Sequence, residues 1–191
     1  MSISRSLVLG LSLLVPASLA APSAFGAEGK PAAKTQTVKA GGVTFEAPAT
    51  WKSLPPTSAM RKAVLSVPSP TKESKDVAEL VVFVFPGGAG TVEQNVERWR
   101  GQFKNSKGGP AEVSSKKVKG KNVDVTRVAV DGEYTNALTK ETAKPDFRLL
   151  GGIVETPDAS YYLKLVGPKS VVDAAEKDFD TLLTTIKAPG K

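Results

Sequence analysis

Residues 77–85 (VAELVVFVF) constrain the fold more than any other segment of the chain. Successive side chains of a β-strand point to opposite sides of its sheet, so Phe83 faces one way and Val82 the other. Both sides of this strand are therefore apolar, and Glu79 is the one charge within it. This pattern predicts a central strand in a sheet that is covered on both faces.

Two segments have the helical spacing needed to cover such a sheet. Residues 92–103 follow Thr91 and Gln94, which form a capping-box pattern, and their apolar side chains recur on one side of a helix. A second helix is predicted to begin at Pro168 and to continue to about Ile186, with a broad apolar stripe. We expect one helix on each face.

The remaining segments predict short strands joined by turns. The alternating or apolar runs are residues 43–46, 63–67, 111–118, 122–134, 147–155 and 161–166. The alternation loses phase near Thr126, which indicates a bulge, and residues 135–145 read as a polar loop. The order β-β-β-α-β-β-β-β-α with short turns predicts an α+β fold, an antiparallel β-sheet flanked by helices.

The chain of 191 residues contains no Cys and no His, which excludes several classes of chemistry. A disulfide framework, a thiol nucleophile, a Cys/His zinc site and a Ser–His–Asp triad all need these residues. The carboxylates are scattered, without the spacing of a calcium loop. We therefore expect no catalytic residues, no metal site and no cofactor.

The N-terminus has the pattern of a secretory signal. Residues 1–26 contain the basic Arg5, an apolar run over residues 7–15, and small residues after Pro16. The apolar run is too short for an uncleaved membrane anchor. We expect cleavage to leave no transmembrane segment and to release a periplasmic or extracellular monomer, with a flexible linker at 27–42 and a single α+β domain at 43–187.

The first predicted helix and the turn before it form the candidate binding surface. Its residues are Gly88, Gly90, Asn95, Arg98, Trp99 and Gln102. A glycine turn at a helix N-terminus can hold an anion, and Arg and Trp are typical anchors of binding surfaces. The structural alternative is a tight connection in which Trp99 packs on the sheet and Arg98 pairs with a carboxylate such as Glu79.

Lysines are frequent between residues 104 and 121. They are Lys104, Lys107, Lys116, Lys117, Lys119 and Lys121 in a chain of net charge +7. Such a cluster could bind an anionic surface, or it could form two solvated turns. The predicted export and the lack of aromatic residues in this segment argue against nucleic acid.

A string of motifs marks a resemblance to known proteins. The motifs are Phe45-x-x-Pro48-x-x-Trp51, Glu79-Leu80, Gly87-Gly88, Asn95-x-x-Arg98-Trp99-x-x-Gln102-Phe103, Asp131-Gly132-x-Tyr134, Arg148-Leu149-Leu150-Gly151, Lys164-Leu165-x-Gly167-Pro168 and Asp178-Phe179. Over residues 43–186 the chain resembles uncharacterised secreted bacterial proteins and, more broadly, the PsbP-like fold.

The PsbP-like resemblance implies an antiparallel sheet between helices, an α/β/α sandwich. This group includes an extrinsic photosystem subunit and a Ran-binding nuclear import factor. The photosystem subunits are associated with manganese and calcium handling and with docking. The absence of His argues against a matching manganese role, and a shared fold does not transfer function.

Three functions follow as hypotheses. The first is an exported, non-enzymatic binding or docking domain whose partner is an envelope protein or an anionic surface. The alternative is a carrier of a small ligand or metal ion, and the third is an enzyme of unknown class. A docking domain predicts exposed Arg98 and Arg100 on a flat apolar patch, whereas a carrier predicts a closed pocket near Trp51 and Trp99.

Overall fold

The computed structural model describes residues 34–136 and 142–189. They form two helices and ten strands within these ranges. The elements are β1 (Thr35–Ala40), β2 (Val43–Pro48), β3 (Lys52–Leu54), β4 (Arg61–Pro68), β5 (Val77–Pro86), α1 (Val92–Arg100), β6 (Phe103–Lys104), β7 (Val113–Lys119), β8 (Asp124–Tyr134), β9 (Lys144–Glu155), β10 (Ala159–Pro168) and α2 (Lys169–Thr185).

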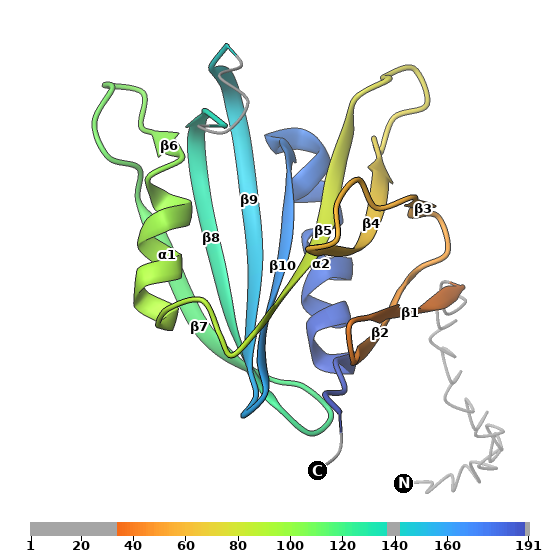
Figure 1. Ribbon diagram of the computed structural model, residues 1–191. Helices are drawn as coiled ribbons and strands as arrows, with labels where there is room; N and C mark the ends of the chain where they lie inside the picture. Colours follow the sequence, from red (N-terminus) through yellow and green to blue (C-terminus); the bar gives the residue numbers. More distant parts are fainter. Residues whose placement is uncertain (1–33, 137–141, 190–191) are drawn as a thin grey trace, which may run out of the picture. The chain divides into compact units, whose positions relative to one another are not determined.

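Eight strands form one antiparallel sheet (Figure 1). Its order is β3-β4-β5-β10-β9-β8-β6, and β7 also pairs with β8. Strand β5 lies between β4 and β10, so the central position predicted from its two apolar sides is confirmed. Strands β1 and β2 form a separate two-stranded hairpin.

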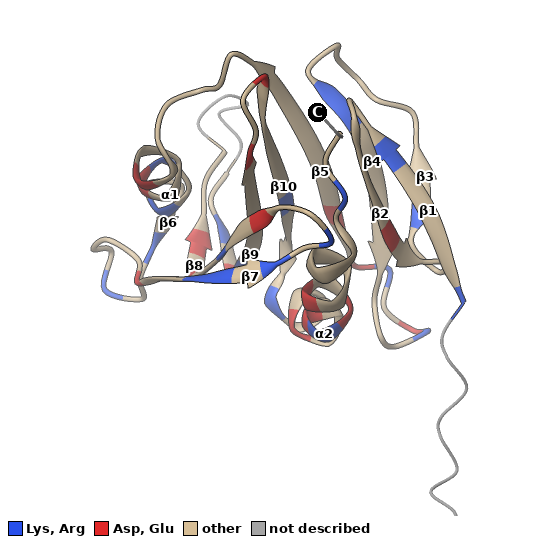
Figure 2. Ribbon diagram, turned by 90° about the horizontal axis from the view of Figure 1, so that it is seen from below, with Lys and Arg blue, Asp and Glu red and all other residues tan. Residues whose placement is uncertain are grey.

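The two helices lie on opposite sides of the large sheet (Figure 2). On one side, α2 and strand β2 pack on the sheet around Phe45, Leu163 and Phe179, which are fully buried. On the other side, Trp99 of α1 packs with Tyr162 and Ile153. The predicted α+β architecture, an antiparallel sheet with a helix on each face, is confirmed.

The segment expected to be a linker contains a strand. Within residues 27–42, Thr35–Ala40 forms β1 and pairs along its whole length with β2. The chain reverses at Gly41, whose φ of 59° suits glycine. The alternating polarity of TQTVKA before Gly-Gly was the signal of this hairpin. Residues 27–33 and the proposed signal at 1–26 lie outside the described residues.

Two predicted boundaries and the position of the predicted bulge were wrong. Helix α1 ends at Arg100, with Gly101 as its C-cap, instead of at Phe103, because Phe103 pairs with Tyr134 as part of β6. Strand β8 is regular at Thr126 and shifts register between Gly132 and Tyr134 instead. The phase loss at Thr126 arises because β8 is buried on both faces. The predicted loop 135–145 is also too long, since β9 begins at Lys144, and residues 137–141 lie outside the described part.

Candidate functional site

The glycine turn and the capping box fix the start of α1. Thr91 Oγ1 accepts a hydrogen bond from the Gln94 backbone N–H, and Gln94 Oε1 accepts one from the Thr91 backbone N–H. Gly90 has a φ of 88°, and a Cβ there would lie 2.5 Å from Gln94 Oε1. The predicted capping box is therefore confirmed. A side chain at position 90 would collide with Gln94 Oε1, so the capping box requires glycine there. Gly88 is exposed beside Ser160.

Asn95 is buried and joins the turn to the sheet. Its side-chain amide donates to the carbonyl oxygens of Ala89 and Thr91 and to the Tyr162 hydroxyl. Its Oδ1 accepts from Arg98 at 2.6 Å. With 2% of its surface exposed, Asn95 is a structural link and offers no contact surface.

Trp99 is also buried, with 6% of its surface exposed. It lies over Gly151, where an added Cβ would come within 2.0 Å of the indole ring. Its ring meets Tyr162 edge-on at a centroid distance of 6.3 Å. Trp99 therefore anchors α1 to the sheet and is not part of an exposed surface.

Two accessible members of the candidate set, Arg98 on α1 and Gln102 just after it, form what we call the rim of α1. Arg98 is exposed and pairs with Asn95, while Glu79 pairs with Arg61 instead. Gln102 is half-buried, and its Oε1 accepts a hydrogen bond from Lys164 Nζ at 2.6 Å. Burial thus divides the six residues: Gly88, Gly90, Arg98 and Gln102 remain accessible, whereas Asn95 and Trp99 do not.

Lys164 is the titratable group that the structure adds to this region. Its ammonium donates to Gln102 Oε1 and to the Tyr134 hydroxyl at 3.3 Å, and lies 5.2 Å from the Tyr134 ring centroid. Burial lowers the pKa of Lys164 to about 8, and the charge of Glu79 opposes this shift. Lys164 therefore holds its charge in an environment that disfavours it.

Arg61 and Glu79 complete a small charged cluster with Lys164. Arg61 forms an ion pair with Glu79 across β4 and β5, and its Nη1 donates to Thr57. The Arg61 Nε is buried and has no hydrogen-bond partner among the residues that the structure describes. The three charged residues point to the side of the sheet that carries α1, as the register of Arg61 with Phe83 and of Lys164 with Val81 requires.

The same side of the sheet extends beyond α1. Contacts of α1 reach β8, Gly151 of β9 and Tyr162 of β10, and β5 and β4 continue the sheet past the helix (Figure 1). We call this part the open face. It consists of Leu54, Arg61, Glu79, Phe83, Lys164 and Val166. Leu54 is 42% exposed, and Phe83 and Val166 are partly exposed.

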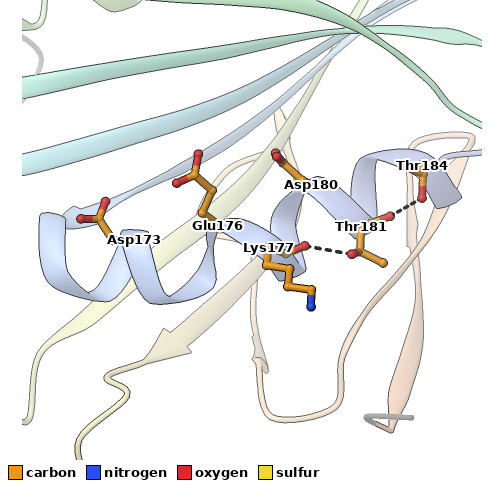
Figure 3. Close-up of a pocket in the computed structure, with 6 residues that line it drawn as sticks. All are labelled: Asp173, Glu176, Lys177, Asp180, Thr181 and Thr184. Carbon is orange, nitrogen blue, oxygen red and sulfur yellow. Dashed lines mark hydrogen bonds between the residues drawn. The ribbon is translucent and has the colours of Figure 1, made fainter. Parts of the chain in front are cut away.

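A shallow hollow of about 610 Å³ lies along α2 (Figure 3). Its acidic side chains Asp173, Glu176 and Asp180 are already paired with Arg148 and Arg127 of the sheet. Burial alone would raise the pKa of Asp173, but hydrogen bonds from Lys169 and Arg148 lower it. These ion pairs fasten α2 to β8 and β9, which explains the cluster without a ligand.

A smaller hollow near the β8 irregularity is lined in part by Glu112, Asp131 and Asp146. Among the described residues, no group of three or more Asp or Glu gathers closely enough to hold a metal ion. Trp51 and Trp99 lie in separate core clusters, and neither lines this hollow or the one on α2. Neither of these two hollows is therefore the closed pocket near Trp51 and Trp99 that the carrier hypothesis predicts.

The lysines of residues 104–121 do not form one patch. Lys104 pairs in register with Glu133 and Lys119 with Asp124, which are opposite ends of β8. At about 3.4 Å per residue these positions are about 30 Å apart. Lys119 also pairs with Asp124, and Lys117 donates to Thr126. Lysine is common on edge strands such as β7, where it discourages strand pairing with other chains.

The sequence signal for the charged cluster was a charge inside an apolar strand. Glu79 interrupts the apolar run of β5, and Lys164 interrupts the run Tyr161 to Val166 in β10. A charge in a central strand needs a reason, because burying it is costly. Register between β5 and β10 could not be read from the sequence, so their proximity was missed.

Comparison with known proteins supports the fold class and nothing finer. The chain matches no family model and no curated protein. It is similar to the solution structure of cyanobacterial PsbP (CyanoP) from Synechocystis sp. PCC 6803, with 12% identity, a TM-score of 0.50, and coverage of 85% of this chain and 96% of that one. The fold is PsbP-like, as the motifs indicated.

A second similar structure is PA94 from Pseudomonas aeruginosa, a protein of unknown function. The identity is 10% and the TM-score 0.50, over 82% of this chain and 99% of that one. At such identities the likeness concerns the fold alone. Within the described residues, neither helix is long and apolar enough to cross a membrane.

Proposed function

We propose that this chain is an exported, non-enzymatic binding domain that docks onto a protein of the cell envelope through the open face and the adjoining rim of α1. The observation that carries the proposal is the unequal covering of the sheet. One side is packed under α2 and β2, whereas the other presents Leu54, Phe83 and Val166 beside α1. Partly exposed apolar side chains gathered on one face are typical of protein-binding surfaces.

The sequence supports the other parts of this proposal. The lack of His and Cys removes the usual nucleophile and base pairs, which favours binding over catalysis. The pattern of residues 1–26 favours export. A PsbP-like fold of this size is compatible with a small binding domain.

Site-specific photo-cross-linking in the native cell envelope tests the proposal. A photoreactive phenylalanine replaces Phe83 on the open face, and in a matched variant it replaces Thr181, which is exposed on α2. We expect a discrete cross-linked product from position 83 and none from position 181. Equal products from both positions, or none from position 83, would contradict docking through the open face.

A further inference from the structure

We infer that the segment received by the open face carries a carboxylate among apolar side chains, as an acidic, partly apolar stretch of a partner protein. This inference rests on the proposed docking role and adds the chemistry of the partner. It follows from three properties of the open face: two largely buried cations, a single carboxylate between them, and an apolar surround.

The first property concerns Lys164. Its two hydrogen-bond partners, Gln102 Oε1 at 2.6 Å and the Tyr134 hydroxyl at 3.3 Å, are both neutral. Among the described residues, no carboxylate oxygen lies within 4.0 Å of its Nζ. An ammonium has three N–H donors, and a largely buried charge is costly without an opposite charge. Within the part of the chain that the structure describes, Lys164 is therefore a cation with no carboxylate in direct contact.

The second property concerns Arg61. Glu79 is its ion-pair partner and also the carboxylate whose charge acts on Lys164. Two cations thus share one carboxylate, and the Arg61 Nε finds no acceptor among the described residues. The cluster carries a net charge of one positive unit, so a second carboxylate brought to this face would be attracted by both cations.

The third property is the surface around these charges. Leu54, Val64 and Val81 lie side by side on neighbouring strands, and Val81 is paired with Lys164. On the same face, Phe83 is paired with Arg61. A phosphate backbone or a lipid headgroup is bound by exposed Lys and Arg side chains that reach into solvent. Here the cations are largely buried among apolar groups, which suits a carboxylate with apolar neighbours on the same chain.

A second copy of this chain fits the site poorly. The acidic group on α2, Asp173, Glu176 and Asp180, is paired with arginines of the same chain. Bringing two open faces together would place like charges opposite each other. A different protein that supplies an unpaired Asp or Glu is the better match.

The test uses a display library of random dodecapeptides selected on the purified chain. Enriched peptides are synthesised with a fluorophore, and their Kd is measured by anisotropy. We expect enrichment of Asp or Glu flanked by apolar residues. We expect Lys164→Met to weaken binding at least tenfold, and Lys177→Met, on the exposed side of α2, to change it less than twofold (Figure 3).

Gln102→Glu provides a second and independent variant. It keeps Lys164 but gives it a carboxylate at the position now held by Gln102 Oε1, so the internal counter-ion competes with that of the peptide. We expect Kd to rise at least fivefold, while thermal melting shows that both variants remain folded.

The outcomes separate the two proposals. Neutral or basic peptides, or acidic peptides that bind Lys164→Met and Gln102→Glu as tightly as the parent chain, would overturn the acidic partner and leave docking intact. No enriched peptide, together with no cross-link at position 83, would overturn both proposals.

Discussion

The two sides of the sheet are covered by helices of very different character. Helix α2 has 17 residues, and its buried side chains are all apolar, from Val171 to Leu183. Helix α1 has nine residues and buries Asn95 and Trp99. Since apolar burial supplies most of the folding free energy, the α2 side holds the fold together. The α1 side is free to present a surface.

Charge is also arranged differently on the two sides. On the α2 side, Arg148 contacts Asp131, Asp173 and Glu176. Burial alone would lower the pKa of Arg148, but the hydrogen bond to Asp173 and the charges of the nearby carboxylates raise it. On the α1 side, Lys164 has neutral partners and a lowered pKa. Balanced charge marks the structural side, and unbalanced charge marks the side that we propose for docking.

The strongest test of this comparison is Phe179→Ala. Phe179 is fully buried under α2, and truncating such a ring costs about 3–5 kcal/mol of unfolding free energy. Urea denaturation measures the loss. Thr181→Ala, on the exposed side of the same helix, should stay within about 0.5 kcal/mol of the parent. A loss below about 1 kcal/mol for Phe179→Ala would show that α2 is not the main stabilising layer.

The buried charge of Lys164 predicts a stability that rises with pH. Its folded-state pKa of about 8 lies below the ordinary lysine pKa of 10.5, so between these values the unfolded chain binds more protons and the free energy of unfolding increases with pH. The full rise is between about 3 and 4 kcal/mol, at about 1.4 kcal/mol per tenfold difference in proton affinity.

Lys164→Met isolates this effect from the other titrating groups. Urea midpoints of the parent and the variant are compared from pH 7 to pH 10.5. We expect the variant to be more stable at pH 7 and this advantage to shrink toward pH 10.5, because deprotonation relieves the parent of its buried charge. A constant difference across this range would mean that Lys164 does not titrate as described.

Two adjacent glycines of β9 face the two helices and allow a direct comparison. An added Cβ at Gly151 would lie 2.0 Å from the Trp99 ring, and one at Gly152 would lie 2.7 Å from Leu183 Cδ2. We expect Gly151→Ala to cost about 1–3 kcal/mol and to shift Trp fluorescence, because a rigid ring must move. Gly152→Ala should cost less, since Leu183 can change rotamer. The reverse order in urea denaturation would contradict this packing.

The elements that could be predicted from the sequence are those with strong local patterns. The central strand around Val82, the capping box at Thr91 and the apolar stripe that contains Phe179 each predicted their element correctly. The errors arose where long-range pairing decides. Phe103 leaves the helical pattern because Tyr134 offers a strand partner, and residues 35–40 form a strand because β2 lies beside them.

The candidate site was predicted in part. The capping box and the apolar spacing located α1 correctly, but helical spacing could not distinguish the exposed Arg98 from the buried Asn95 and Trp99. Polar Asn95 is buried because its amide satisfies the carbonyl oxygens of the turn. Lys164 and Arg61 were missed because their proximity depends on the register of three strands.

The smallest predicted effect concerns the start of α1. Thr91 caps the helix, whereas α2 begins after Pro168 without a side-chain cap. A long helix with a buried apolar stripe depends little on its cap, whereas a short helix with two buried residues depends more on the hydrogen bonds of its first turn. Thr91→Ala should therefore cost about 1 kcal/mol of unfolding free energy, with faster amide hydrogen exchange in the first turns of α1 and unchanged exchange in α2.

The control is Thr91→Ser, which retains the hydroxyl and should keep the protection of the parent chain. Equal acceleration in both helices would mean that α1 unfolds only together with the whole domain. That result would contradict the separate stability of the two sides of the sheet.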